Sequence, residues 1–186
     1  MLLTEDGSTT LYNEIIGEHY HSTHGAIQES QHIFIKDGLN ECKKDEIHIL
    51  EMGFGTGLNA FLTMLEAEKT GKKIHYYTVE LYPISEEQAK TLNFAQILSP
   101  EKNEDFLKLL GAVELVASRK GRDSAFNETK INTQFWLQVV PGLTEEFIQK
   151  HFPEKEDVQT QTQSNTQSQT LSKAIKLRED SSVNLQ

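Results

Sequence analysis

Residues 51–59 read EMGFGTGLN, and this stretch decides how the chain folds. The residues before it, 47–53, form a short apolar run that stops at glycine, which is typical of a buried parallel strand. The residues after it, Leu58 to Lys69, have apolar side chains at helical spacing, and Gly71 follows as a stop signal. Glycines at such a junction let the chain turn tightly and bring backbone amides close to a ligand. The stretch therefore predicts a strand, a ligand-binding turn and a helix.

The same alternation continues along the chain. Residues 74–80 (IHYYTVE) repeat the strand pattern, and a capping box at Ser85 predicts a helix that runs through Leu98. Ser99 and Pro100 then predict the start of another helix, which runs through Leu110. Alternating strands and helices favour an α/β fold with a parallel sheet and right-handed crossovers. Weaker candidates follow: strands at 112–118 and 134–140 and a short helix at 144–152.

The chain is expected to form one folded domain over residues 1–156. Its first part, 1–40, mixes turns and short strands, with a strand expected at 32–38, and is assigned to the substrate side. Residues 41–110 form the cofactor-binding βαβα unit, and residues 111–156 are a divergent end. Residues 159–170 contain no apolar side chain, so they cannot offset the entropy of ordering. We therefore expect residues 157–186 to be a disordered tail.

Composition limits the classes of partner and compartment. The chain has 186 residues and 37% hydrophobic content, enough for one core. Its formal charge of −10 disfavours broad binding to nucleic acid, because phosphates are bound by lysine and arginine. A single cysteine, Cys42, excludes an intramolecular disulfide, and neither a secretory signal nor an apolar stretch of about 18 residues is present. We expect a cytoplasmic protein without a membrane span. Local basic patches are the candidates for contact with RNA: Lys69, Lys72 and Lys73, or Arg119, Lys120 and Arg122.

Two glutamates sharpen the interpretation of the glycine stretch. The glycines have the spacing G-x-G-x-G, which differs from the dinucleotide pattern G-x-G-x-x-G. Glu80 ends the second predicted strand, where such folds hold ribose hydroxyls with a carboxylate. Glu51 precedes the first glycine, suits a ligand with a cationic amino-acid end and would repel the pyrophosphate of NAD. The pattern favours S-adenosylmethionine, and the alternative is an ordinary tight turn with two surface glutamates.

Three histidines near the N-terminus raise the question of a metal site. His19, His21 and His24 lie close together, but no fourth ligand stands nearby at a familiar spacing. We interpret them as loop histidines that line the substrate entrance, and the sequence predicts no metal centre.

Several separate stretches together resemble one known family. They read LYNE at 11–14, YHSTHGAIQES at 20–30, EMGFGTGLN at 51–59 and YTVELYP at 77–83, with Phe34 between them. The sequence resembles the methyltransferase domain of the tRNA 5-methylaminomethyl-2-thiouridine biosynthesis enzymes over residues 8 to about 110.

The resemblance implies a Rossmann-like, S-adenosylmethionine-dependent methyltransferase fold that is incomplete at its C-terminal side. The implied reaction methylates the aminomethyl nitrogen of the wobble uridine in tRNA, and the implied partner is an FAD-dependent oxidase, separate or fused. The family's cofactor-site positions match four residues of this chain, and three neighbours in the glycine stretch join them in our assignment: Gly53, Gly55, Gly57 and Glu80, with Glu51, Phe54 and Asn59. The substrate-side residues are His24, Gly25 and Glu29.

The chain departs from the family in its last third. In the family, a carboxylate that holds the substrate amine follows the fourth strand in an Asp-Ala-Phe-Ala-Pro stretch, which is absent here. Asp123, in DSAF at 123–126, is the nearest catalytic candidate, and residues 111–186 are divergent, truncated or frame-shifted. Two alternatives to an active tRNA methyltransferase therefore stay open: a catalytically impaired, cofactor-binding remnant, and a small-molecule methyltransferase.

Overall fold

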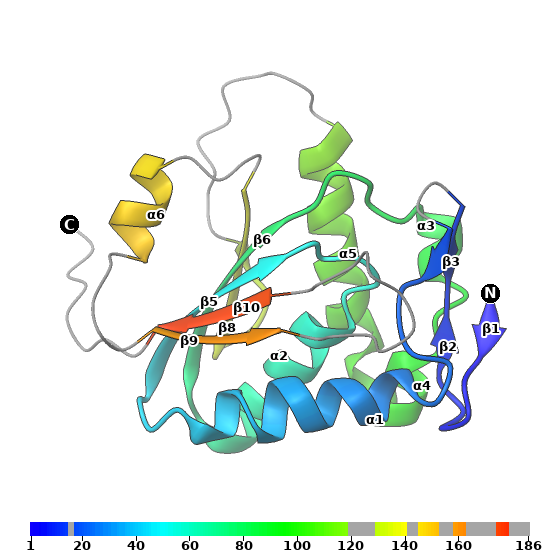
Figure 1. The fold of residues 1–186 in the computed structure, drawn as a ribbon, viewed down its shortest axis with the longest axis horizontal. Coiled ribbons are helices and arrows are strands. Elements are labelled where there is room, and N and C mark those ends of the chain that lie inside the picture. Colours follow the sequence, from blue (N-terminus) through cyan, green and yellow to red (C-terminus); the bar gives the residue numbers. More distant parts are fainter. Residues whose placement is uncertain (15–16, 119–128, 141–144, 153–157, 163–173, 179–186) are drawn as a thin grey trace.

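The fold is built on one mixed sheet with a parallel centre (Figure 1). The computed structural model describes residues 1–14, 17–118, 129–140, 145–152, 158–162 and 174–178. Strand β6 lies between β5 and β8 and runs parallel to both, whereas β7 and the pair β10–β9 add antiparallel strands at the two edges. The α/β fold class with a parallel sheet is confirmed. The strands are β5 (Glu46–Met52), β6 (Lys73–Val79), β7 (Thr129–Lys130), β8 (Phe135–Val139), β9 (Val158–Thr162) and β10 (Ala174–Arg178).

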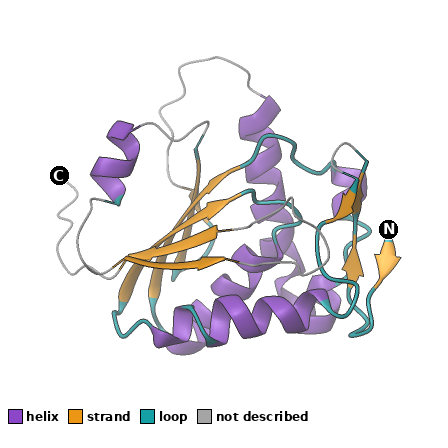
Figure 2. Cartoon of the chain, viewed as in Figure 1, coloured by secondary structure: helices purple, strands orange, loops and turns teal. Residues whose placement is uncertain are grey.

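The central strands are buried on both faces. Five consecutive residues are buried in β5 and five in β6, which explains why both read as continuous apolar runs rather than alternating ones. Figure 2 shows most helices gathered on one side of the sheet, and the main core lies there. The helix α6 (Glu145–His151) lies on the other side and packs Phe147 and Ile148 against Leu50 and Tyr77. The strand predicted at 134–140 and the helix predicted at 144–152 are confirmed as β8 and α6.

The crossover helix begins directly after the glycine stretch, as predicted. Helix α2 (Leu58–Thr70) ends at Gly71, whose φ of 75° is the left-handed conformation that glycine adopts most readily. The capping box at Ser85 is also confirmed, but the helix predicted through Leu98 is two short helices, α3 (Glu86–Ala89) and α4 (Phe94–Leu98). The break occurs at Asn93, because its side chain bonds to the backbone of Thr9 and Gly7 in the N-terminal segment.

Two predicted strands are helical in the structure. Residues 32–38 were expected to form a strand, but Gln31–Lys36 form a π-helix that continues α1 (Ala26–Ser30). Residues 112–118 were expected to form a strand and instead end α5 (Asn103–Ser118), which follows a 3-10 turn at Pro100–Lys102. A short apolar run does not distinguish a strand from a buried helix, and extending an existing helix costs less than starting a new element.

Short hairpins and turns make up the rest of the described N-terminal region. Strand β1 (Leu2–Leu3) pairs with β2 (Thr9–Thr10), and β3 (Tyr12–Asn13) pairs with β4 (Glu18–His19). A 3-10 turn at Leu39–Glu41 leads into β5. No helix among the described residues is long and apolar enough to cross a membrane.

Part of the expected disordered tail is extended in the structure. Strands β9 and β10 pair with each other, and β10 adds antiparallel to β5. An open sheet edge offers unpaired backbone N–H and C=O groups, which bind another strand without needing apolar side chains. The structure thus differs from our expectation at these residues, and the rest of 157–186 lies outside the described residues.

Asp6 organises the N-terminal segment. Its Oδ1 accepts hydrogen bonds from the Thr4 hydroxyl at 2.7 Å and from the Ser8 amide at 3.0 Å, and its Oδ2 accepts from the Gln28 amide at 2.9 Å. Burial alone would raise the pKa of Asp6, but the hydrogen bonds from Ser8, Gln28 and Thr4 outweigh it and lower the pKa to about 2. The carboxylate thereby ties the first turn of α1 to the N-terminal hairpin.

We expect Asp6→Asn to lower the free energy of unfolding by about 1 kcal/mol at neutral pH, after allowing for solvent screening. Because the folded pKa lies below the ordinary value of 3.8, the contribution is complete above pH 3.8 and is lost as the pH falls through about 2. Urea unfolding at several pH values measures this, with Asp37→Asn, a substitution of a half-exposed acid, as control. A difference between wild type and Asp6→Asn that stayed constant down to pH 2 would contradict the assignment.

Candidate functional site

Hydrogen bonds donated by its own backbone amides hold the glycine loop between β5 and α2 in place. The Gly53 amide donates to the Val79 carbonyl of β6 at 2.9 Å, and the Gly57 amide donates to the Phe54 carbonyl at 3.0 Å. The Gly55 amide donates to Glu80 Oε2 at 2.7 Å. The loop is therefore fixed to the end of the neighbouring strand, which brings together the glycines and Glu80 as the sequence predicted.

Glu80 links this loop to the segment that follows β6. Its second oxygen, Oε1, accepts a hydrogen bond from the Tyr82 amide at 2.8 Å. A carboxylate oxygen has two lone pairs, so each oxygen can still accept a hydrogen bond from a ligand. Glu80 thus supports the loop and remains able to bind hydroxyl groups.

Glu51 and Asn59 lie beneath the loop rather than on the surface. Glu51 is fully buried, and its Oε1 accepts a hydrogen bond from Asn59 Nδ2 at 3.1 Å, which joins the end of β5 to the start of α2. Burial, and then the charge of Glu51, raise the pKa of Tyr76 well above its ordinary value. Phe54 is also buried and packs under Gly57. The surface alternative for Glu51 is therefore wrong.

His21 supports the same loop from the N-terminal segment. Its Nε2 lies 2.5 Å from the hydroxyl of Thr56, and both side chains are buried. The sequence suggested a histidine at the substrate entrance, but the structure places His21 behind the loop, where it packs edge-on against Phe94. His21 therefore helps to fix the conformation of the glycine loop.

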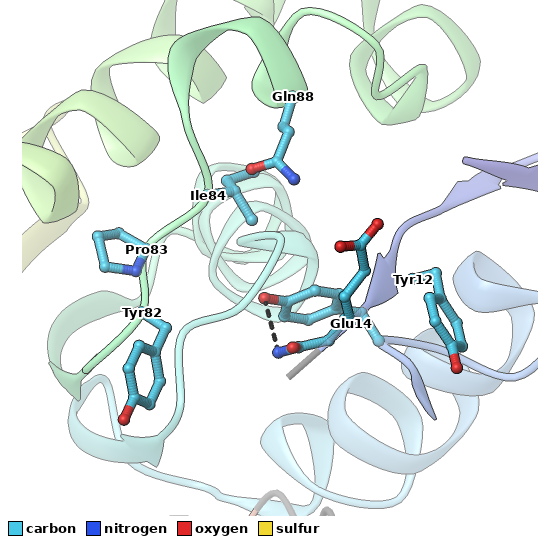
Figure 3. A pocket seen from close by; sticks show the side chains of 8 residues that line it. Tyr12, Glu14, Tyr82, Pro83, Ile84 and Gln88 are labelled. Atoms are coloured by element: carbon cyan, nitrogen blue, oxygen red, sulfur yellow. Dashed lines mark hydrogen bonds between the residues drawn. The ribbon is translucent and has the colours of Figure 1, made fainter. Parts of the chain in front are cut away.

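A cavity of about 310 Å³ is lined in part by Tyr82, whose amide binds Glu80 (Figure 3). Tyr20 connects the two: its hydroxyl accepts a hydrogen bond from Asn13 at 3.3 Å, and burial, then the charge of Glu80, raise its pKa. The cavity is lined by Tyr12, Asn13, Glu14, Tyr20, Tyr82, Pro83, Ile84 and Gln88.

The lining of the cavity favours a cationic or amine ligand. Glu14 is exposed, and in Figure 3 it stands between Tyr12 and Tyr82. Gln88 uses its Oε1 to accept from the Ser85 amide, which leaves its amide N–H groups for the cavity. The described residues of the lining include a carboxylate and neither lysine nor arginine, so this lining would repel a phosphate.

The substrate-side residues are less closely grouped. His24 lies on the surface, where its Nδ1 is 3.0 Å from Glu5 Oε1. Gly25 is buried against Asp6, and a Cβ there would lie 2.8 Å from Asp6 Oδ2. Glu29 is half-buried on α1, and its Oε2 has no hydrogen-bond partner within the described ranges. Asp123, the catalytic candidate, lies outside the described residues.

Each of the three lysines that could form an RNA-binding patch lies near an oxygen of the protein itself. Lys69 pairs with Glu66 at 3.2 Å, Lys72 donates to the Cys42 carbonyl, and Lys73 Nζ lies 4.0 Å from a Glu46 oxygen. The alternative patch, residues 119–122, lies outside the described residues.

The chain is similar in sequence to known tRNA-modification proteins. Over 97 residues the chain is 34% identical to the tRNA 5-methylaminomethyl-2-thiouridine biosynthesis bifunctional protein MnmC of Burkholderia mallei (strain SAVP1) and of Burkholderia pseudomallei (strain K96243). The chain carries an MnmC-like segment. The alignment covers 48% of this chain and 14% of each relative, so the chain spans a small part of their length.

The remaining comparisons concern family models and solved structures. No family model matches the chain. The crystal structure of MNMC2 from Aquifex aeolicus is similar with a TM-score of 0.47 and 23% identity, and it covers 83% of this chain and 44% of that chain.

Sequence reasoning missed the acid and the aromatic residues of the cavity. Glu14 and Tyr20 stand in stretches that carry the MnmC-like resemblance, and Tyr82 follows Glu80 closely, so a signal was present. The sequence could not show that these side chains meet in one cavity, because Glu14 comes from the β3–β4 turn and Tyr82 from the loop after β6.

Two glycine substitutions test the loop geometry. Gly53 and Gly57 have φ of 79° and 75°, so alanine at either position costs about 1 kcal/mol in backbone strain. A Cβ at Gly57 would lie 2.9 Å from Phe54 Cε1 and 3.2 Å from Leu110 Cδ2, whereas a Cβ at Gly53 meets nothing within 4 Å. We expect Gly57→Ala to lower the free energy of unfolding by about 3 kcal/mol and Gly53→Ala by about 1 kcal/mol. Denaturant unfolding checks this, and equal losses would mean that Phe54 does not restrain Gly57.

Proposed function

We propose that this chain is an S-adenosylmethionine-dependent methyltransferase that acts on an amine. The observation that carries the proposal is the 2.7 Å hydrogen bond between the Gly55 amide and Glu80, beside a cavity that contains a second carboxylate. In this proposal Glu80 accepts the ribose hydroxyls and stands between the glycine loop and the cavity that would bind the amine, which is the order of groups that the reaction needs.

The residues present fit the cofactor. Glu80 has lone pairs left for the two ribose hydroxyls, and the space above Gly53 is open to a ligand. Gly53, Gly55 and Gly57 shape the loop, while Glu51, Phe54 and Asn59 hold it from below. The Oε2 atom of Glu29 is buried and lacks a hydrogen-bond partner in the described part of the chain, which supports a ligand-binding role for Glu29 on the substrate side. We assign His24 and Gly25 to the same side because they are close to Glu29 in the sequence.

Little catalytic machinery is required of the protein. When bound, the cofactor supplies a methyl group on an already activated sulfonium. The chain must bind the substrate amine, hold it in line with the methyl group and accept the proton that the amine loses. Glu14 is the carboxylate we assign to this task, since Asp123 lies outside the described residues. Tyr12 and Tyr82, both exposed beside Glu14, can stack on a flat ring such as a nucleobase.

We further propose that the amine is the aminomethyl group of a wobble uridine in tRNA. The MnmC relatives are named as tRNA 5-methylaminomethyl-2-thiouridine biosynthesis proteins, which supports this choice. Their description as bifunctional is compatible with the separate or fused oxidase that the resemblance implies. Two observations favour a small-molecule amine as the second candidate: the net charge of −10, and the acceptors that occupy Lys69, Lys72 and Lys73. A cofactor-binding remnant without activity is the third.

Calorimetric titration with S-adenosylmethionine tests cofactor binding. We expect Glu80→Gln to weaken affinity at least tenfold, because it removes the charge that accepts the ribose hydroxyls, and Gly53→Ala to weaken it because a Cβ enters the ligand's space. The control is Glu87→Gln, which removes an exposed acid on α3. Equal affinities for wild type, Glu80→Gln and Gly53→Ala would place the cofactor elsewhere.

Single-turnover methyl transfer tests the reaction. The substrates are tRNA from a strain that lacks this modification step and the free nucleoside 5-aminomethyl-2-thiouridine. We expect transfer to tRNA, with a loss of about 10²–10⁴ in rate for Glu14→Gln and unchanged cofactor affinity. Glu18→Gln, a half-buried acid on β4 that does not line the cavity, serves as control. Transfer to the nucleoside alone would favour the small-molecule alternative, and cofactor binding without any transfer would identify a remnant.

A further inference from the structure

A second cluster of functional side chains lies at the opposite end of the same strands. Glu46 is the first residue of β5, and His48 stands two residues further along on the same face. His48 is in register with His75 of β6, so the two imidazoles occupy neighbouring positions on parallel strands. The strand spacing thus brings two histidines and a carboxylate together without any contribution from a loop.

The distances match those of a metal-ligand set. One oxygen of Glu46 and one ring nitrogen of each histidine all lie within 4.8 Å of one another. His75 Nε2 and Glu46 Oε1 are 3.1 Å apart. Two ligand atoms at about 2.0–2.2 Å from one zinc ion in tetrahedral geometry stand a little over 3 Å apart. This pair is therefore already at the separation that such an ion needs.

The surroundings hold the two histidines in place. His48 is 6% exposed and His75 is 8% exposed, and His75 stacks on Trp136 of β8 at 5.2 Å. The Tyr77 hydroxyl lies 3.1 Å from His48 Nδ1. A metal-binding histidine usually makes a hydrogen bond with the ring nitrogen that does not touch the metal, and the Tyr77 hydroxyl is such a partner for His48.

We propose that Glu46, His48 and His75 bind a divalent transition-metal ion, with Zn²⁺ as the ion that this ligand set suits best. Two imidazoles and one carboxylate form a known zinc ligand set, and imidazole disfavours Mg²⁺ and Ca²⁺. The imidazole planes of His48 and His75 are stacked at 11° with centroids 4.6 Å apart, so bringing both nitrogens to one ion turns one ring out of this stack. The bonds to the ion must offset the stacking that is lost.

The metal site is separate from the methyl-transfer site. Glu80 follows His75 by five residues, which corresponds to about 16 Å along an extended chain. Ligands of open α/β sheets bind at the carboxyl ends of the strands, whereas Glu46 stands at the amino end of β5. The ion therefore acts as a clamp that joins β5 to β6.

Titration of the metal-free full chain with Zn²⁺, followed by calorimetry and thermal unfolding, tests the proposal. We expect one ion per chain, a rise in the unfolding temperature, and affinity weakened at least tenfold in Glu46→Gln and in His75→Asn. Glu46 is half-exposed, so Glu46→Gln is expected to fold even if His75→Asn does not.

Two control variants separate the cluster from other features. Lys73→Met removes the ion pair with Glu46 but keeps all three ligands, so its Zn²⁺ affinity is expected to equal or exceed that of wild type. His32→Gln removes an exposed histidine outside both sites and is expected to leave the Zn²⁺ affinity unchanged. Absence of Zn²⁺ binding, or equal affinity for wild type and Glu46→Gln, would overturn the proposal. A Glu46→Gln effect matched by Lys73→Met would show that the ion pair, not the ligand oxygen, is responsible, and would overturn it too.

Discussion

The hydrogen bond from the Gly55 amide to Glu80 is the contact on which the rest of the site depends. It joins the turn after one parallel strand to the end of the next. A second hydrogen bond, from the Gly53 amide to the Val79 carbonyl, joins the same turn to the residue before Glu80. The other oxygen of Glu80 binds the Tyr82 amide, so the same carboxylate sets the wall of the cavity. One side chain thus fixes the loop and the cavity relative to each other, which is the positional accuracy that the proposed in-line transfer would require.

Negative charge is the second constraint. Glu14 lines the cavity, Glu80 holds the glycine loop and Glu51 lies buried beneath that loop, while the described residues of the cavity lining include neither lysine nor arginine. Such a site attracts a sulfonium or an ammonium and repels phosphate, which fits both the donor and the acceptor of an amine methylation. The same charge makes an approach of polyanionic RNA costly. Contacts with a tRNA would therefore depend on stacking and shape near Tyr12 and Tyr82 more than on phosphate binding.

How much the sequence could predict depends on the range of the forces involved. Residues 47–80 were predicted closely, because strand, glycine turn and helix are each specified by neighbouring residues. The break at Asn93 could not be predicted, because it results from hydrogen bonds to residues more than 80 positions away. The same holds for the pairing of β10 with β5. In the site, Glu80 followed from its place at a strand end, whereas Glu14 reaches the cavity and His21 reaches the glycine loop only through the folding of the N-terminal segment.

The two ends of β5 and β6 divide structural and chemical tasks within one pair of strands. At the carboxyl ends, the glycines have no side chains to pack, which leaves the backbone open to the proposed ligand. A few hydrogen bonds hold the loop there. At the amino ends, aromatic and imidazole rings stack across three strands, from His48 through His75 to Trp136. Any tie at that end restrains sliding of β5 past β6, and a slip in register would separate Gly55 from Glu80. The stacked rings therefore protect the geometry of the site from a distance, through the stiffness of the strands rather than through contact.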